Sequence, residues 1–257
     1  MDQIADRMLQ KYERAKQARV NFEPLFEDCY EYALPMRQSF FSETPGQRRD
    51  DKIFDETAVV GVQEFASRLQ SGLVPNFARW ADFIAGSEIP KDQQDEVNNT
   101  LDEVTDYVFE VIQNSNFGQE IHESFMDLAV GTGVLLVEEG DAVNPVRFNA
   151  IPLPSVHLDT GPDDKIDHVY RERSLKNSEI PIAYPKAILG EKTAAGILSQ
   201  PDTQTKILEV ICRNYSTPNE EQFDYYVVNV GDKEIIYQEN YKGLGSNHFV
   251  GFRWSKA

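Results

Sequence analysis

Apolar residues recur at helical spacing through the first half of the chain, most clearly between Asp55 and Gly72. An apolar stripe on one side and polar residues on the other are typical of an amphipathic helix with one buried face. We expect Asp55 to cap the start of this helix, Gly72 to end it in a left-handed conformation, and Pro75 to prevent it from resuming. The stripe consists of Ala58, Val62, Phe65, Ala66, Leu69 and Leu73.

Four further helices are predicted before residue 131. Two of them cover residues 4–20 and 22–34, and Pro35 ends the second. A long helix over residues 92–115 carries apolar residues in steps of four and three, which predicts a face turned toward the core. That stripe consists of Val97, Leu101, Val104, Val108, Val111 and Ser115. Ser115 or Asn116 can cap the next helix, and the polar residues 40–51 form a loop.

The pattern changes near Gly131 from helical spacing to short apolar or alternating runs, which predict strands. Gly231-Asp232 is a hairpin signal, and residues 180–200 are expected to hold one or two short helices. The predicted fold class is α+β, with a helical layer over residues 1–131 and a mostly antiparallel β region over 132–257. The predicted strands are residues 134–137, 147–151, 156–158, 166–173, 206–215, 223–230 and 234–237.

Composition excludes some classes of protein. The 257 residues contain no apolar run long enough for a membrane span and no signal-peptide pattern at the start. Cys29 and Cys212 lie far apart in apolar surroundings, so each is expected to be a buried free thiol.

The formal net charge of −18 limits the possible partners. Proteins that hold nucleic acid tightly neutralise its phosphates with clustered Lys and Arg, so a DNA-wrapping protein is disfavoured. An acidic wall past which DNA slides without sticking remains compatible with this charge, because repulsion opposes tight binding. An acidic surface that only maintains solubility explains the charge equally well.

No catalytic, cofactor-binding or metal site is predicted. Gly131-Thr132-Gly133 precedes a strand, whereas a dinucleotide-binding turn needs strand, glycines and helix in that order. The chain has no phosphate-binding GxxxxGK[ST] sequence, and its four histidines are not spaced as ligands. His157 and Asp159 are two residues apart, would point the same way on a strand and could orient a proton-transfer group, but no recognisable nucleophile lies nearby. Asp163-Asp164 could bind a cation in a turn, although a solvated acidic loop is commoner.

A few large or basic side chains are candidates for contacts with other subunits or with the DNA backbone. Arg48 and Arg49 lie in the polar loop beside two aspartates, where an exposed ion pair is the simpler interpretation. Tryptophans suit subunit contacts but are more often core residues. The full candidate set is Arg48, Arg49, Trp80, Arg253 and Trp254.

Five segments, in order along the chain, together resemble the head-to-tail connecting (portal) proteins of short-tailed bacteriophages. They include an aspartate-threonine helix that ends in a leucine-proline step before a tryptophan, a tyrosine–proline turn and a glycine-bearing helix-to-strand junction. A strand that returns through an arginine and a late aromatic-Arg-Trp step complete the series. The segments are residues 30–40, 53–80, 128–140, 148–172 and 249–255.

The resemblance implies a structural virion protein without catalytic residues or cofactors. It implies a homo-oligomeric ring, typically of twelve subunits, at the capsid portal vertex, through which viral DNA is packaged and ejected and to which the tail attaches. Capsid, scaffolding, terminase and tail proteins would be partners, double-stranded DNA would pass without sequence-specific binding, and assembly would take place in the host cytoplasm. The chain corresponds to the family's N-terminal wing region, so we expect residues 1–257 to form one wing-like region without the stem and clip.

Two other hypotheses remain open. The chain could be another phage structural protein, such as a tail adaptor or capsid subunit. It could also be an acidic enzyme whose site is assembled from dispersed residues such as His157 and Asp159, in which case a deep pocket should surround them.

Overall fold

The computed structural model describes residues 2–37, 40, 53–217 and 220–254. These residues form two compact units. Unit 1 comprises the described residues within Met1–Asp28, Gln38–Thr44 and Pro152–Phe249, and unit 2 comprises those within Cys29–Arg37, Pro45–Ile151 and Val250–Ala257. Helix α2 (Glu23–Ala33) is shared, because the division falls inside it. Secondary structure changes from helix to strand at Gly131, as predicted, but neither unit follows that boundary.

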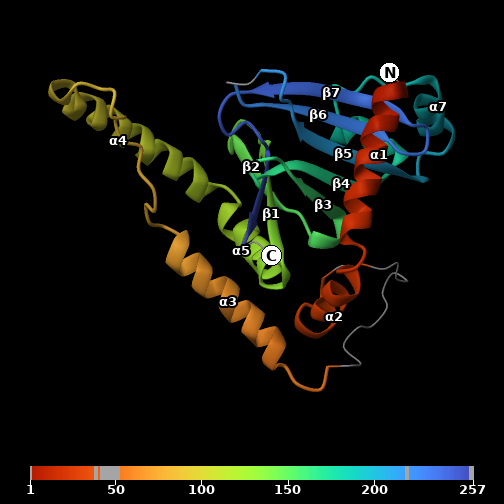
Figure 1. The fold of residues 1–257 in the computed structure, drawn as a ribbon, viewed down its shortest axis with the longest axis horizontal. Helices are drawn as coiled ribbons and strands as arrows, with labels where there is room; N and C mark the ends of the chain where they lie inside the picture. The colour runs from red at the N-terminus through yellow and green to blue at the C-terminus, as the bar shows by residue number, and fades with distance from the viewer. Residues whose placement is uncertain (1, 38–39, 41–52, 218–219, 255–257) are drawn as a thin grey trace. The chain divides into compact units, whose positions relative to one another are not determined.

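Unit 1 is built on a five-stranded antiparallel sheet in which each strand lies beside the next one in the sequence (Figure 1). Short turns join the first strand to the second and the fourth to the fifth, whereas residues 177–203 between the second and the third hold short helices. The turn at Gly231-Asp232 occurs where the sequence predicts it. The strands are β3 (Val156–Thr160), β4 (Ile166–Lys176), β5 (Gln204–Arg213), β6 (Gln222–Asn229) and β7 (Glu234–Lys242).

Helix α1 (Asp2–Arg19) covers one face of this sheet (Figure 1). Its Met8 and Tyr12 pack against alternate residues of β5, such as Leu208 and Val210, since side chains two apart share a face of a strand. Arg19 fixes the end of the helix by donating hydrogen bonds to three backbone carbonyls around η2 (Leu153–Ser155).

The opposite face of the sheet is covered at one end by short helices. These are η3 (Asn177–Glu179), α6 (Ile180–Ala183) and α7 (Glu191–Ser199), in the region where short helices are predicted. Ile180 and Tyr184 pack on Ile207 and Val227. The alternation of apolar and polar residues over 166–173 predicts a half-exposed strand. That prediction is wrong for β4, because both faces are covered there and Asp167 and Arg171 are buried together with Val169 and Tyr170.

Unit 2 combines three helices with a three-stranded sheet of order β2-β1-β8. Ala66 packs with Phe125 and Leu128 against Leu135 and Phe148, which join helix and sheet in one core. The strand β8 was not predicted, because its five residues carry no clear alternation. The elements are α3 (Thr57–Leu73), α4 (Lys91–Asn114), α5 (Phe117–Val130), β1 (Thr132–Glu139), β2 (Val146–Ala150) and β8 (Phe249–Arg253).

The predicted ends of α3 are partly corrected. The Asp55 carboxylate accepts a hydrogen bond from the Thr57 backbone N–H at 2.6 Å, so the expected cap interaction exists, although Glu56 occupies the cap position. Gly72 is not a left-handed cap, because the helix continues to Leu73. Pro75 follows directly after the closing residue Val74, as a helix stop should.

The apolar stripes of α3 and α4 are less buried than predicted. In α3 only Ala66 of its stripe is buried, while Ala58 and Leu73 are exposed. The prediction that α4 presents a core-facing stripe is wrong, because its buried residues are Thr105 and Phe109 and Val104 of the stripe is 44 % exposed. Helical spacing alone cannot specify whether another element covers the apolar face.

For the thiols, Cys212 is free and buried as predicted, and Cys29 is free but half-buried.

Candidate interaction surface

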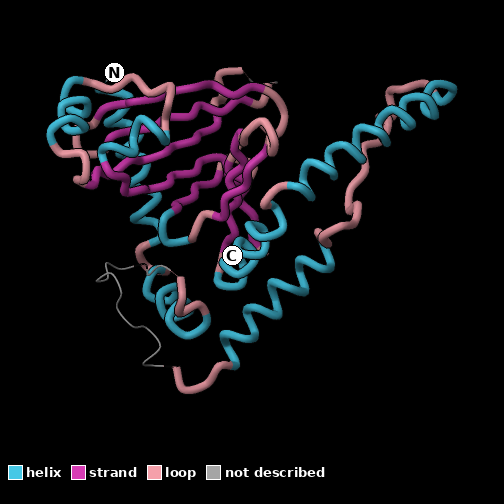
Figure 2. Tube along the Cα trace, turned by 180° about the vertical axis from the view of Figure 1, so that it is seen from behind, coloured by secondary structure: helices cyan, strands magenta, loops and turns pink. Residues whose placement is uncertain are grey.

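An extended segment lies along α4 in unit 2 and carries the candidate Trp80. We call residues 79–90 the strap, and the strap together with α4 the arm. Figures 1 and 2 both show the strap beside the helix. The Phe83 N–H donates to Thr105 Oγ1 at 3.2 Å, and the Ala85 N–H donates to Asn98 Oδ1 at 2.8 Å. Polar side chains of α4 thus accept the hydrogen bonds that a neighbouring strand would otherwise accept from the strap backbone.

Arg79 joins the strap to α4 through exposed ion pairs. Its guanidinium contacts the carboxylates of Asp102 at 2.5 Å and Asp106 at 2.8 Å on the helix, and also that of Asp82 on the strap. The hydrogen bond to Asp102 contributes most to the raised pKa of Arg79, and the hydrogen bond to Asp82 contributes next. One cation is shared by three carboxylates, so this cluster remains negatively charged. The arm as a whole is acidic too, because α4 contains seven acidic residues and one lysine.

Trp80 borders a small pocket of about 250 Å³ at the start of the arm. Its indole meets the Phe109 ring edge-on at 5.2 Å and stacks on Phe117 at 6.1 Å. The side chain remains 39 % exposed, so it is neither a core residue nor fully in solvent. The non-glycine residue Phe77 has a φ of 65°, an uncommon conformation for a bulky side chain, and is almost fully exposed beside the pocket. The apolar residues of the lining include Val74, Pro75, Phe77, Trp80, Phe109, Ile112 and Phe117.

The other candidate tryptophan lies at the end of β8. Trp254 is 70 % exposed, and its ring meets the Phe65 ring of α3 edge-on at 5.9 Å between centroids. Arg253 beside it is also exposed. Among the described residues no ring contact joins Trp80 to Trp254, so the structure does not bring these candidates into one site. Arg48 and Arg49 lie outside the described residues.

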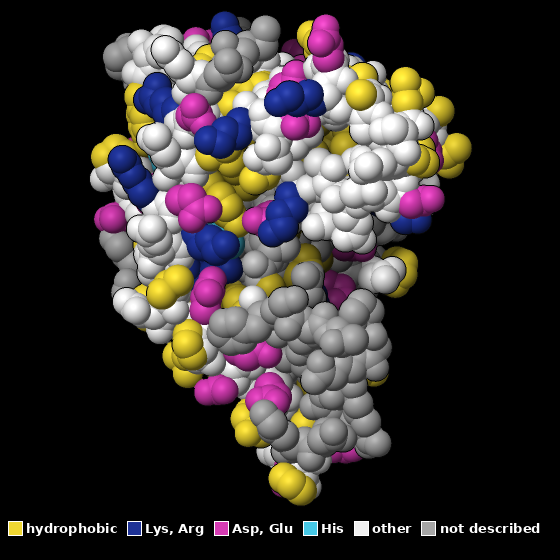
Figure 3. All heavy atoms as spheres, turned by 90° about the vertical axis from the view of Figure 1, so that its right-hand side faces the viewer, with side chains coloured by type: hydrophobic (Ala, Val, Ile, Leu, Met, Phe, Trp, Pro, Cys, Tyr) yellow, Lys and Arg dark blue, Asp and Glu magenta, His cyan; other side chains and the backbone are white. Residues whose placement is uncertain are grey.

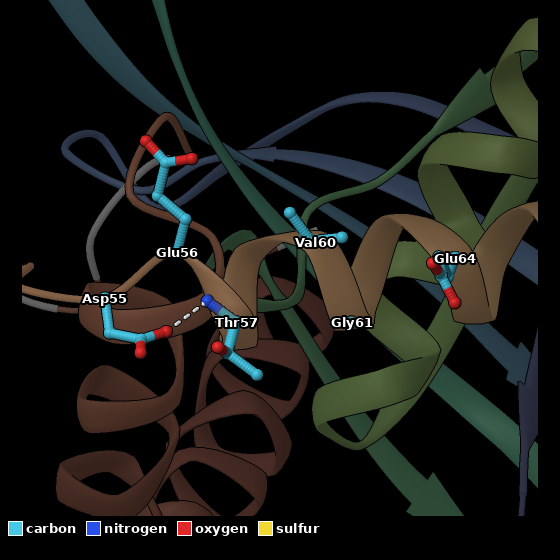
Figure 4. A pocket seen from close by; sticks show the side chains of 6 residues that line it. All are labelled: Asp55, Glu56, Thr57, Val60, Gly61 and Glu64. Carbon is cyan, nitrogen blue, oxygen red and sulfur yellow. Dashed lines mark hydrogen bonds between the residues drawn. The ribbon is translucent and has the colours of Figure 1, made fainter.

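The start of α3 forms a shallow acidic surface (Figure 4). The hydrogen bond from Thr57 lowers the pKa of Asp55, and the carboxylate there also interacts favourably with the positive end of the helix. Asp55 and Glu56 point to opposite sides of the chain, and Glu64 lies two turns further along the helix (Figure 4). These side chains form an acidic surface at the helix terminus.

Basic residues of unit 1 are mixed with acidic ones. On the face seen in Figure 3, Lys and Arg side chains lie singly beside Asp and Glu. Lys206 pairs with Glu172 at 3.0 Å and Lys233 pairs with Asp6 at 3.3 Å. These pairs are typical of a solvated surface of mixed charge and differ from the continuous basic patch of a tight phosphate-binding site.

His157 and Asp159 do not form a proton-transfer pair. The His157 ring is buried against the edge of Tyr12 at 5.2 Å, and within the described residues neither ring nitrogen has a hydrogen-bond partner. Burial lowers the pKa of His157 to about 3, so the ring is neutral at physiological pH. Asp159 instead accepts a hydrogen bond from the Thr160 N–H.

Among residues 2–37, 40, 53–217 and 220–254, no cluster of three or more His, Cys, Asp or Glu side chains could hold a metal ion. Asp163 lies 3.8 Å from the Arg213 guanidinium instead. None of the described helices has the length and apolar character of a membrane span.

The family model of the bacteriophage head to tail connecting protein matches residues 5–257 of this sequence. The chain belongs to this family. Comparison with curated proteins gave no match. As a head-to-tail connecting protein, the chain has a structural role in the virion, where capsid and tail meet it.

Two of the segments that resemble the connector family meet in unit 2. A Cβ atom at Gly133 would lie 2.5 Å from the Phe252 ring and 2.7 Å from the Ser124 carbonyl oxygen. A glycine is therefore required where β1 leaves α5, because the ring of β8 fills the space that a side chain would need. In this chain the glycine junction and the late aromatic step therefore pack directly against each other.

A further connector segment supplies a buried polar cluster that sequence analysis missed. The Tyr30 hydroxyl donates to Asp127 Oδ1, and Arg37 Nη1 lies 3.4 Å from Asp127 Oδ2. Arg37 also contacts Glu123 at 2.5 Å. Desolvation raises the pKa of Asp127 to about 6, although Arg37 and Tyr30 act in the opposite direction. The signal available in the sequence was an aspartate at an inward-facing position of α5.

Proposed function

We propose that this connector is the subunit of a portal ring through which viral DNA is packaged and ejected and to which the tail attaches. The match of the family over residues 5–257 is the observation that carries the proposal. Twelve copies, capsid, scaffolding, terminase and tail proteins as partners, and assembly in the host cytoplasm belong to the same proposal.

Exposed apolar side chains on the arm are an argument for self-association. Ile84 on the strap is 76 % exposed and Tyr107 on α4 is 65 % exposed, although both lie on elements that hydrogen bonds hold in place. Large apolar side chains on a fixed, solvated element are typical of interaction surfaces. The Trp80 pocket adds a partly open aromatic site, and such sites often carry much of the energy of an interface.

A ring requires heterologous contacts, in which one patch of a subunit meets a different patch of the next. An acidic lining would let DNA pass, since like charges oppose tight binding. The net charge of −18 supports that property. We also propose that the protein performs no bond-making chemistry, a view supported by the buried, neutral His157 and its lack of a hydrogen bond to Asp159.

The test uses the complete gene product that contains this chain. Electron microscopy and light scattering should show closed rings of about a dozen subunits, and the rings should release duplex DNA at about 150 mM salt, where screening is already strong. Ile84→Ser should reduce ring formation, whereas Leu198→Ser, at a still more exposed position of α7, should not. A gene product that stays monomeric at high concentration, or rings that retain DNA tightly at that salt, would contradict the proposal.

A further inference from the structure

Two exposed helix faces in the chain carry opposite charges with the same repeat. On α1 the outward stripe has Arg7 and Arg14, seven residues apart, among glutamines and without an acidic residue. On α4 the outward stripe has Glu96, Glu103 and Glu110, also seven residues apart. Seven residues of helix rise about 10.5 Å, so the charges on the two stripes have the same spacing.

The members of each stripe advance by alternating steps of four and three, so each set lies along one side of its helix. All of them are exposed. The α1 stripe consists of Gln3, Arg7, Gln10, Arg14 and Gln17, and the α4 stripe consists of Glu96, Thr100, Glu103, Tyr107, Glu110 and Asn114.

None of these charged side chains is paired within the described part of the chain. The ion pairs of α1 involve Asp6 and Arg19, and those of α4 involve Asp102 and Asp106. The stripes therefore keep their charges available on the surface, while Asp6, Arg19, Asp102 and Asp106 of the same helices are engaged in ion pairs.

We propose that the α1 stripe of one copy packs along the α4 stripe of a second copy of this chain. The inference rests on the proposed ring and identifies the two surfaces that form it. The patches differ, so the contact is heterologous, as ring closure requires. Tyr107 lies between Glu103 and Glu110, so an arginine placed there meets two carboxylates and the face of an aromatic ring. Each exposed ion pair strengthens association by up to roughly fivefold, so two or three aligned pairs favour one register.

Charge reversal in the complete gene product tests the contact. Arg7→Glu with Arg14→Glu places negative charges on both stripes, and Glu103→Lys with Glu110→Lys places positive charges on both. We expect each double variant to need at least roughly tenfold higher concentration for half-assembly than the wild type, because like charges then face each other. Lys186→Glu with Lys192→Glu makes the same charge change as the double arginine variant, at exposed positions of unit 1, and should leave assembly unchanged.

Mixing the two double variants shows whether the α1 and α4 stripes meet between two copies or within one chain. In an alternating ring every α1 stripe meets an α4 stripe of opposite charge, so the mixture should assemble although neither variant does so alone. The fourfold variant with all four reversals should also assemble, which shows that the altered chains still fold.

The possible failures can be distinguished. If the wild type stays monomeric, the proposed function and this inference both fail. If the wild type forms rings but the reversals have no effect, or if only the fourfold variant recovers and the mixture does not, this inference alone is overturned. It is also overturned if Arg7→Glu with Arg14→Glu lowers DNA binding and leaves assembly intact, since the α1 stripe would then face nucleic acid.

Discussion

Asp127 is fully buried in unit 2, where its carboxylate accepts a hydrogen bond from Tyr30 and pairs with Arg37. The tyrosine and the arginine come from the segment around α2, so the cluster holds that segment against α5. The burial penalty exceeds both favourable interactions, since the pKa rises to about 6. The buried site therefore favours the neutral form of Asp127, and the side chain contributes through its contacts with Tyr30 and Arg37.

Stability should depend on this carboxyl group. Because its pKa is higher in the folded chain than the ordinary value near 4, the folded state binds the proton more tightly. The free energy of unfolding should fall by roughly 1–3 kcal/mol as pH rises from about 4 to 6. Urea unfolding across this range should show the loss in the wild type and a smaller loss in Asp127→Asn. The exposed control Glu139→Gln should keep the wild-type slope, and an unchanged slope in Asp127→Asn would contradict the assignment.

Gly133 gives a second prediction for a single residue. Gly133→Ala should destabilise unit 2 by roughly 1–3 kcal/mol, because the new Cβ overlaps the Phe252 ring and a backbone oxygen that cannot move away cheaply. Gly61→Ala is the matched control, since that helical glycine has nothing within 4 Å of the added atom. It should stabilise α3 by roughly 0.5–1 kcal/mol. Denaturant unfolding measures both, and equal effects would refute the close packing at Gly133.

At the scale of elements, the strap and α4 form a pair that depends on side-chain hydrogen bonds. Thr105 is fully buried, donates to the Leu101 carbonyl at 2.7 Å and accepts from the Phe83 N–H. A threonine beside the apolar stripe of α4 is here the group that accepts a hydrogen bond from the backbone of an extended neighbour. We therefore assign the Thr105 hydroxyl to holding the strap against α4.

Thr105→Val should loosen the strap without melting α4. The substitution keeps the shape and removes the acceptor, so the Phe83 amide should exchange with solvent up to roughly tenfold faster, in line with about 1 kcal/mol for one hydrogen bond. Thr100→Val is the control, because the Thr100 hydroxyl bonds only to the Glu96 carbonyl of its own helix. Equal exchange in the two variants would show that the strap is held by other contacts.

At the scale of the whole molecule, the net charge of −18 gives salt two opposite effects. Salt screens repulsion among the excess carboxylates of one folded chain, but it also screens attraction between oppositely charged stripes of two chains.

Raising NaCl from about 20 to 300 mM should therefore increase the thermal unfolding midpoint of the dilute, monomeric protein. Over the same range the concentration for half-assembly should rise, as measured by sedimentation. A midpoint that falls with salt would mean that internal ion pairs such as Arg79–Asp102 outweigh the net repulsion.

The sequence by itself determined the order of the main elements up to β7, the α+β class, the hairpin at Gly231-Asp232 and the family. These depend on local periodicity, turn residues and a string of short motifs, all of which can be read from neighbouring positions. Tertiary structure decided which apolar faces are covered: β4 lost its expected solvent face, while the stripe of α4 remained partly open. It also placed β8 beside β1 and Tyr30 on Asp127, because long-range partners are chosen by the packing of the whole fold and leave no periodic signal in either segment.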